Sequence, residues 1–382
     1  MSRICDVVVA GGSIAGLTFA SEAAKRGLSV IVAEEHPEVG EPEKCDGLVS
    51  LRGLRKYGYP PEGAAVQDQI TSAILHSPSG KRLAVNASAL DVVVLDRSAY
   101  DKQVEAAASA AGAKVTTGSR VGDVHEKVDS VSVKVGTEDV QAKFLVDATG
   151  PASSPRRGIL PAAKYEVEGD WIRQHVVEVF LDAEKYPGYF AWVIPFGKHR
   201  AKVGAAGYGV SPFRALDRFL EGRSTTVLRK VSAPIYVGGP AQSFVRGRRV
   251  YVGESAGQVK PTTAGGIMTS VAGGVAAAKW VSSSILEGRP PLVERYQKEW
   301  EGDFLKEMKA MMRLRGVFEK LSNHDLEAVF SVLAAPRLVK KLSQTDFDFH
   351  ASALLGSLGM PGLLRVARVV ASAEVRSILL ER

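Results

Sequence analysis

The stretch at residues 4–35, ICDVVVAGGSIAGLTFASEAAKRGLSVIVAEE, decides the fold class of this chain. Val7–Ala10 is a short apolar run, as is typical of a buried parallel strand. The segment Gly11-Gly12-Ser13-Ile14-Ala15-Gly16 then opens a helix with apolar residues on one face. Basic residues and a glycine at 25–27 end that helix, and residues 29–33 form a second apolar run. This order predicts parallel strands joined by a helix.

The glycine turn and the acidic residue after the second strand have the spacing of a dinucleotide site. Gly11 permits the sharp turn, and Gly16 lets the helix pack closely on the strand. The first amides of the helix can face a pyrophosphate, and Glu34 can bind a ribose hydroxyl. Ser13 stands where a second glycine is usual. The stretch therefore predicts a Rossmann-type unit, without separating NAD from FAD.

Two later segments bring further residues toward a nucleotide. VVVLDRSAY at 92–100 joins a strand to a helix, and Arg97 at the junction can reach a flavin diphosphate or ring edge. The alternative for Arg97 is an ion pair with Asp101. KFLVDATG at 143–150 is an apolar strand that ends at Asp147 and is followed by Gly150. Strand ends of this kind approach a bound nucleotide.

Two more segments favour a flavin. RVYVGESAGQVKPTTAGGIMTSVAGG at 249–274 reads as a strand, a turn containing Glu254, and a helix that starts at Gly265-Gly266. The amino end of that helix suits the negative charge on a flavin's pyrimidine edge. EPEKCDGLVS at 41–50 places Cys45 and Gly47 in a loop that can lie under the ring.

The segment YFAWVIPFGKHRAKVGAAG at 189–207 predicts a strand with one aromatic face. Phe190, Trp192 and Ile194 alternate along it, and Pro195 ends the strand. The alternation leaves open whether this face packs against core, a flavin or an apolar substrate.

Together these segments resemble the para-hydroxybenzoate-hydroxylase-type FAD superfamily and, within it, the geranylgeranyl reductase family of archaea and photosynthetic organisms. The resemblance spans residues 1–290 and is strongest at the glycine turn, Arg97, 147–150 and 253–267. Cys45-Asp46-Gly47-Leu48 is similar to the family's Cys-Gly-Glu/Asp-Gly-Leu segment, but one residue shorter. Glu254 replaces the family's usual aspartate.

The aromatic strand carries a second part of the resemblance. Phe190-x-Trp192-x-Ile194-Pro195 is similar to the family's Tyr-x-Trp-x-Phe-Pro, with both outer aromatics changed. The family continues seven or eight residues later with Gly-x-Gly, to which Gly204 corresponds, whereas Ala206 replaces the second glycine. By this resemblance we expect Phe190 and Trp192 to line the substrate cavity over the flavin ring.

The resemblance implies a fold class and a domain division. The expected class is α/β, with a Rossmann-type FAD-binding domain, an α+β substrate domain built on an antiparallel sheet, and a C-terminal helical region. The expected FAD-binding domain is discontinuous and covers 1–59, 96–150 and 247–290. The substrate sheet covers 60–95 and 151–246, and the helical region covers 291–382.

The resemblance also implies the site residues, with FAD as the only bound nucleotide. The expected catalytic residues are Cys45, Trp192 and Phe190. No metal site is expected, since the histidines are scattered along the chain. The expected cofactor-binding residues are Gly11, Ser13, Ala15, Gly16, Glu34, Cys45, Asp46, Gly47, Arg97, Val121, Gly150, Glu254, Gly265, Gly266 and Ile267.

The last third of the chain has a helical pattern with an apolar stripe. Tyr296, Trp300, Phe304 and Met308 recur at four-residue spacing. The stripe either packs on the flavoprotein core or walls a tunnel for a long apolar chain. Arg365, Arg368 and Arg376 further along either meet lipid phosphates or face solvent.

The composition of the chain narrows the cellular compartment and the binding partners that we expect. The 382 residues carry a net charge of +7, which favours anionic partners, yet no basic block with interleaved aromatics points to nucleic acid. Two cysteines make no disulfide framework, so a reducing compartment is expected. Without a signal peptide or an apolar run of about 18 residues, we expect a cytoplasmic protein, with possible peripheral contact on the inner face of the membrane.

The resemblance implies an FAD-dependent reductase that saturates C=C bonds of geranylgeranyl chains in isoprenoid membrane-lipid precursors. Reduced flavin would deliver the hydride from N5. With no second nucleotide unit in the sequence, the expected donor is NADPH or a small redox protein such as ferredoxin, bound transiently. The alternatives are a flavin-dependent monooxygenase or halogenase, whose Trp-x-Trp-x-Ile-Pro strand is similar to 190–195, and a non-catalytic flavin carrier. For a halogenase, Lys44 lacks the setting of the catalytic lysine.

Overall fold

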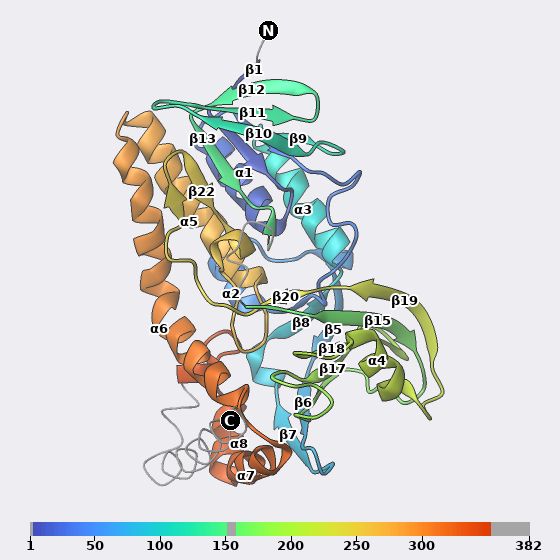
Figure 1. Ribbon diagram of the computed structural model, residues 1–382. Helices are drawn as coiled ribbons and strands as arrows, with labels where there is room; N and C mark the ends of the chain where they lie inside the picture. The colour runs from blue at the N-terminus through green and yellow to red at the C-terminus, as the bar shows by residue number, and fades with distance from the viewer. Residues whose placement is uncertain (1–2, 151–157, 353–382) are drawn as a thin grey trace.

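The computed structural model describes residues 3–150 and 158–352 (Figure 1). Over these residues the chain forms two large sheets, one in the upper half of the view and one in the lower half, and helix α6 (Arg295–Phe318) runs down the side of both. The fold class predicted from the sequence is therefore confirmed as α/β with a Rossmann-type unit.

The upper sheet is parallel at its centre, and its central strands are largely apolar because both faces of the sheet are covered. Val7 and Val9 of strand β2 (Val7–Ala10) pack under helices α1 (Ile14–Lys25), α3 (Arg97–Ala110) and α5 (Ile267–Leu286). Val8 and Ala10 of the same strand face a small four-stranded sheet on the other side. The strand order is β21 (Val245–Arg246), β22 (Arg249–Tyr251), β13 (Phe144–Asp147), β2 (Val7–Ala10), β3 (Val30–Ala33) and β9 (Lys114–Thr116). The small sheet has the order β1 (Arg3–Ile4), β12 (Glu138–Ala142), β11 (Val131–Val135) and β10 (Val121–Glu126).

The lower sheet is mostly antiparallel, and its two faces have different neighbours. One face packs on helix α4 (Pro212–Leu220), and the other faces the loops of the upper half. The order is β19 (Thr226–Ser232), β15 (Ala162–Glu168), β18 (Arg200–Ala206), β17 (Ala191–Pro195), β16 (Val176–Phe180), β6 (Ser72–His76) and β7 (Arg82–Asn86).

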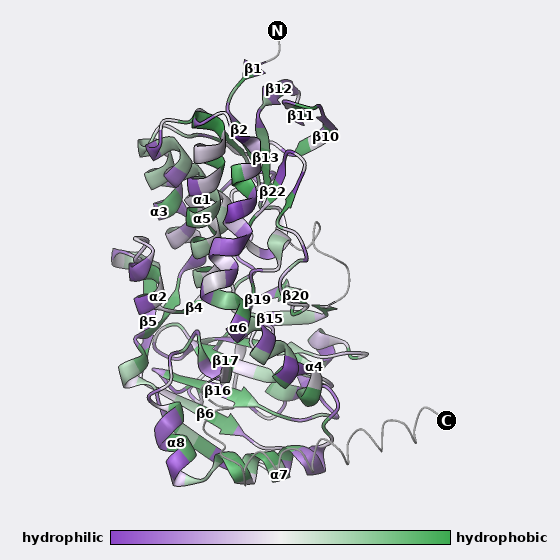
Figure 2. Cartoon of the chain, turned by 90° about the vertical axis from the view of Figure 1, so that its left-hand side faces the viewer, coloured by the Kyte–Doolittle hydropathy of each residue, from purple (hydrophilic) through white to green (hydrophobic). Residues whose placement is uncertain are grey.

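The hydropathy of the elements follows their position in the fold. In Figure 2, strand β13 of the upper sheet and strand β6 (Ser72–His76) of the lower sheet are largely hydrophobic in colour, while the surface helix α8 (Pro336–Leu342) is largely hydrophilic.

Two strand pairs connect segments that the sequence assigns to different domains, namely 48–50 with 92–95 and 245–246 with 249–251. Strand β4 (Leu48–Ser50) pairs with β8 (Val92–Leu95), which also pairs with β5 (Val66–Ile70). Strand β21 pairs with β22 in the upper sheet, and β14 (Ile159–Leu160) pairs with β20 (Ile235–Tyr236). The borders themselves stay a prediction.

The apolar stripe predicted at 296–308 is buried in the main core, where α6 packs against α5. This placement favours the core-packing alternative over a tunnel wall. Helices α7 (Asn323–Leu333) and α8 follow, and Phe330 packs against strand β7. Arg365, Arg368 and Arg376 lie outside the described residues. In the part of the chain that is described, no helix combines the length and the hydrophobicity needed to cross a bilayer.

Candidate cofactor and active site

A cavity of about 670 Å³ opens where the parallel strands of the upper sheet end at their carboxyl side. The glycine turn after β2, Glu34 after β3 and residues 147–150 after β13 all line it. The start of α3, the loop at 40–45 and residues from β22 to α5 complete the wall. Open α/β sheets bind ligands at this position.

The glycine turn forms a close cradle that no larger residue could make. Gly11 has a φ of +97°, and a Cβ built on it would lie 2.7 Å from the carbonyl oxygen of Ala148. A Cβ on Gly16 would lie 2.3 Å from the carbonyl oxygen of Gly11. Ser13 precedes α1 without capping it, since its hydroxyl donates to the Ala148 carbonyl at 3.2 Å. The first amides of α1 therefore have no side-chain cap, as a phosphate-binding helix start requires.

Glu34 is held at the end of β3 by three hydrogen bonds. Its Oε2 accepts from the Gly12 amide at 2.7 Å, and its Oε1 accepts from the His36 amide at 2.9 Å. Oε1 also lies 2.6 Å from His36 Nδ1. The carboxylate thus has a fixed direction at the cavity wall, where a ribose would be bound. His36, which also lines the cavity, was missed by the sequence analysis.

Arg97 forms the ion pair with Asp101 and also lines the cavity, while its contact with a flavin stays a prediction. Its guanidinium lines the cavity and donates to Asp101 through Nε at 3.1 Å and Nη2 at 2.9 Å. Burial alone would lower the pKa of Arg97, but the Asp101 carboxylate and the nearby Cys45 raise that pKa above its ordinary value. Burial raises the pKa of Asp101, and Arg97 opposes the shift. The pair places a cation at the cavity wall.

Glu254 lies in the tight turn η4 (Gly253–Ala256) and faces Gly150 across the cavity. A Cβ on Gly150 would be 3.6 Å from Glu254 Oε2. Burial raises the pKa of Glu254 to about 7, and a backbone hydrogen bond from Tyr236 partly opposes this. Burial thus disfavours the negative charge on this carboxyl group, which lowers its repulsion of a phosphate.

Helix α5 also presents an uncapped amino end to the cavity. Gly266 precedes the helix without a side-chain cap, and both Gly266 and Ile267 line the wall. Gly265 does not line it, and a Cβ at this position would lie 2.7 Å from Lys260 Cε. The backbone dipole of α5 therefore points into the cavity, as predicted for a site that receives negative charge.

The loop at 43–47, called the Cys45 loop below, lies between the cavity and the lower sheet. Cys45 is exposed and lines the cavity, and it is followed by Gly47 with a φ of +80°. A Cβ on Gly47 would lie 2.2 Å from the Leu95 carbonyl oxygen, so only glycine fits there. Asp46 points the other way and accepts a 2.7 Å hydrogen bond from Trp192 Nε1.

The aromatic strand is confirmed as β17, but its rings lie beside the Cys45 loop and outside the lining of the cavity. Phe190 stacks on Tyr189 with ring centroids 4.1 Å apart, and Trp192 meets both rings edge-on. Trp192 extends across Gly204 of the neighbouring strand to reach Asp46. Their predicted position over a flavin ring stays a prediction.

The cavity gathers most of the cofactor-binding residues expected from the sequence. Those that line it are Gly11, Ser13, Ala15, Glu34, Cys45, Arg97, Val121, Gly150, Glu254, Gly266 and Ile267. The expected cofactor-binding residues outside the lining are Gly16, Asp46, Gly47 and Gly265, and the expected catalytic residues Phe190 and Trp192 also lie outside it. Lys164 and Lys202 were missed. Their signal is a lysine at an inward position of an alternating strand, since Lys202 shares a face with Ile194.

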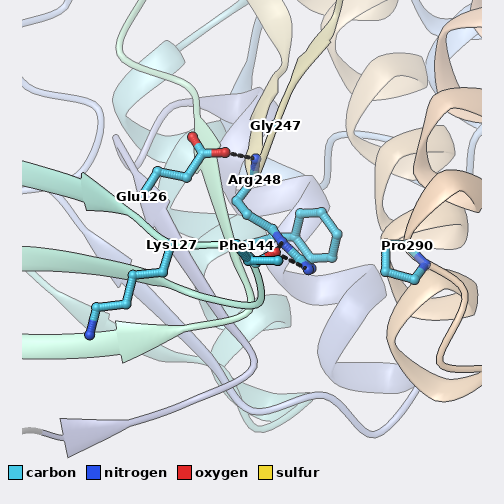
Figure 3. Close-up of a pocket in the computed structure, with 7 residues that line it drawn as sticks. Glu126, Lys127, Phe144, Gly247, Arg248 and Pro290 are labelled. Carbon is cyan, nitrogen blue, oxygen red and sulfur yellow. Dashed lines mark hydrogen bonds between the residues drawn. The ribbon is translucent and has the colours of Figure 1, made fainter.

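A second hollow of about 630 Å³ lies beside Arg248, between the hairpin end at 126–128 and Pro290 (Figure 3). The Arg248 amide donates to Glu126 at 2.7 Å, and its guanidinium lies 5.2 Å from the Phe144 ring centre. None of the predicted site residues lines this hollow. The first cavity is therefore the candidate site.

The sequence and the fold are both similar to those of known flavin enzymes. A family model described as FAD dependent oxidoreductase matches residues 6–168. The chain is 31% identical to digeranylgeranylglycerophospholipid reductase 2 of Methanothermobacter thermautotrophicus over 88% of this chain and 94% of that protein.

Solved structures show the same fold. A geranylgeranyl bacteriochlorophyll reductase-like protein from Thermoplasma acidophilum superposes with a TM-score of 0.85 at 23% identity, over 98% of this chain and 99% of that one. The halogenase PltM, solved in complex with FAD, has a TM-score of 0.68 at 16% identity, over 99% of this chain and 92% of that one. The halogenase alternative is thus the less similar of the two.

Proposed function

The chain belongs to the digeranylgeranylglycerophospholipid reductase family of FAD-dependent oxidoreductases, and from this premise we propose that it saturates C=C bonds of geranylgeranyl chains in membrane-lipid precursors. The observation that carries the proposal is the close glycine cradle at the cavity, in a chain 31% identical to such a reductase over 94% of that protein's length. The family resemblance read from the motifs is confirmed.

The cavity residues fit FAD. The turn at Gly11 and the uncapped start of α1 would hold the diphosphate, and Glu34 would hold the adenosine ribose. Glu254, with its raised pKa, would accept or donate a hydrogen bond beside the flavin chain. The amino end of α5 would face the flavin ring. When bound and reduced, FAD supplies a hydride to the substrate carbon.

We propose that the remaining task of the chain is to orient an extended alkene and to exclude water. Cys45 reaches the cavity, and Trp192 is fixed from the other side of the Cys45 loop through Asp46. Phe190, stacked on Tyr189, extends the apolar surface next to Trp192. We assign these three side chains to the wall that contacts the lipid.

We further propose that electrons come from NADPH or a small redox protein that binds transiently, and that the protein lies in the cytoplasm with peripheral contact to the membrane's inner face. One dinucleotide turn in the sequence supports a transient donor. The net charge of +7 supports contact with anionic lipid surfaces.

The test is anaerobic photoreduction of the FAD-loaded protein, followed by addition of a geranylgeranyl lipid. Return of the oxidised flavin spectrum, with a lipid product heavier by two hydrogens per bond in mass spectrometry, is expected. The proposal fails if only oxygen reoxidises the flavin and an aromatic compound gains a hydroxyl or a halogen. Mass spectrometry of lipids that co-purify with the protein gives an independent measure of the substrate class.

A further inference from the structure

Two buried lysines of the lower sheet hold the Cys45 loop in place. We propose that Lys164 and Lys202 are positioning residues, which fix the backbone of this loop and thereby set where Cys45 stands in the cavity. Both lysine side chains are 1% exposed. The relevance of this inference to the reaction rests on the proposed function. The contacts themselves do not depend on that function.

Lys202 makes three polar contacts, two with the Cys45 loop and one with the end of strand β8. Its Nζ lies 2.6 Å from Glu43 Oε1, 3.4 Å from the Asp46 carbonyl oxygen and 3.4 Å from the Leu95 carbonyl oxygen. An ammonium group has three donors, so these contacts use its full capacity. Two of the three acceptors are backbone oxygens. Lys202 therefore fixes the path of the backbone in addition to pairing with the Glu43 carboxylate.

Lys164 binds the backbone of Cys45 itself. Its Nζ donates to the carbonyl oxygen of Cys45 at 2.9 Å and lies 3.7 Å from Asp46 Oδ1. Trp192 donates to the other oxygen of the same carboxylate. The carbonyl groups of Cys45 and Asp46 therefore each accept from a buried lysine.

The register of the lower sheet explains why these side chains converge. Gly204 on β18 lies opposite both Lys164 on β15 and Trp192 on β17. Lys202, two residues before Gly204, shares that face of the sheet. Three strands thus present one aromatic ring and two ammonium groups to a single loop.

Energetics favour positioning over stabilisation as the role of the pair. Burying an ammonium group is costly, and replacing a buried ion pair by apolar residues is often neutral or stabilising. The stability of the fold alone therefore does not explain lysines at these two positions. Their ammonium groups can instead hold a loop whose carbonyl groups face away from water.

The thiol of Cys45 offers a direct readout of the loop. The chain has two cysteines, and Cys5 is buried with its pKa raised to about 11 by that burial. Alkylation by iodoacetamide near neutral pH therefore reports on Cys45. The rate is measured on the full-length, FAD-loaded protein, together with the flavin absorbance spectrum.

The deciding variant is Lys202→Met combined with Glu43→Gln, which removes the lysine without leaving a buried carboxylate behind. Loss of a charge-assisted hydrogen bond shifts the equilibrium between the held and the released Cys45 loop by about tenfold or more. We expect Cys45 alkylation to change by at least about tenfold, with a shifted flavin spectrum. Glu43→Gln alone removes the carboxylate but keeps both carbonyl contacts of Lys202, so its change in alkylation rate should be smaller than that of the double variant. Lys164→Met should show the same change as the double variant.

The matched control is Glu178→Gln, which breaks a buried pair with His76 at 2.6 Å on the opposite face of the same sheet. It should leave Cys45 alkylation unchanged. Wild-type alkylation and a wild-type spectrum in a folded double variant would overturn the proposal, as would an equal change in Glu43→Gln alone. If Lys202→Met alone does not fold, the double variant still decides. Neither readout uses the lipid, so a wild-type protein that fails to reduce geranylgeranyl lipids would contradict the proposed function only.

Discussion

The ring of Trp192 occupies the space that a side chain at Gly204 would need. A Cβ built on Gly204 would lie 2.1 Å from two carbons of the indole ring. The two residues face each other across β17 and β18, and the ring extends over the glycine to donate to Asp46 at 2.7 Å. Gly204 is thus required by the path of Trp192 toward the Cys45 loop, which gives a physical reason for a glycine after this aromatic strand.

Gly204→Ala should destabilise the protein, because the new methyl group displaces the Trp192 ring and breaks its hydrogen bond to Asp46. The expected loss in the free energy of unfolding is about 1–3 kcal/mol, measured by urea denaturation. Gly302→Ala is the control, since Gly302 lies in α6 with open space around its Cβ position. That change should stabilise the helix by roughly 0.5–1 kcal/mol. Equal effects of both changes would contradict the explanation.

Gly16→Val should abolish retention of FAD. The Cβ alone would lie 2.3 Å from the Gly11 carbonyl oxygen, so α1 must move away from the turn that forms the cradle. The measurement is the ratio of flavin absorbance to protein absorbance after purification, with circular dichroism to show that the variant is folded. A yellow, fully loaded variant would refute the assignment of this turn.

Glu254 should make the stability of the FAD-free protein fall as the pH rises from about 4.5 to about 7. Burial raises the pKa of Glu254 from 4.5 to about 7 in the folded state, so over this window the folded chain keeps a proton that the unfolded chain has lost. The cost is absent below the window and complete above it, on the order of 3 kcal/mol at most.

Glu254→Gln should remove this part of the pH dependence, because the amide does not titrate. The quantity to compare is the difference in unfolding free energy between wild type and variant at pH 5 and pH 8. A difference that is the same at both pH values would show that the carboxyl group has an ordinary pKa.

The two roles of Arg97 can be separated by a pair of variants. Asp101→Asn leaves the buried guanidinium without its carboxylate and should cost about 3–5 kcal/mol of stability. Combining it with Arg97→Met removes the uncompensated charge and should recover most of that loss. If Arg97 also holds the diphosphate, the double variant should bind FAD about tenfold more weakly in a fluorescence titration. Wild-type FAD affinity would leave only the structural role.

Local sequence patterns predicted the upper half well, because its chemistry is carried by short segments. Val7–Ala10, the turn at Gly11 and Glu34 lie within one strand–helix–strand unit, and the structure places Ala10, Gly11 and Glu34 at one cavity. The alternation at 190–195 likewise predicted strand β17. In each case the period of the apolar residues fixes the element and the direction of its side chains.

The lysines that hold the Cys45 loop could not be found in this way. Lys164 and Cys45 are separated by 119 positions, and Lys202 and Glu43 by 159, so no local pattern joins them. The alternation predicted that Trp192 lies on a face that packs against another part of the protein. It did not predict that the Cys45 loop covers that face. The stripe at Tyr296 and Trp300 is another case, since its period predicted a helix without saying that the buried partner is α5.

The order of strands in the upper sheet also has a consequence for folding. Strand β13 pairs with β2 on one side and with β22 on the other, so residues 9, 146 and 250 become neighbours across long stretches of chain. Such distant pairings close large loops and form slowly. During synthesis, β22 emerges only after residue 251 of 382 has been added, so the nucleotide cradle cannot be complete before then. We therefore expect flavin loading to be a late event in the maturation of this protein, after the lower sheet has been synthesised.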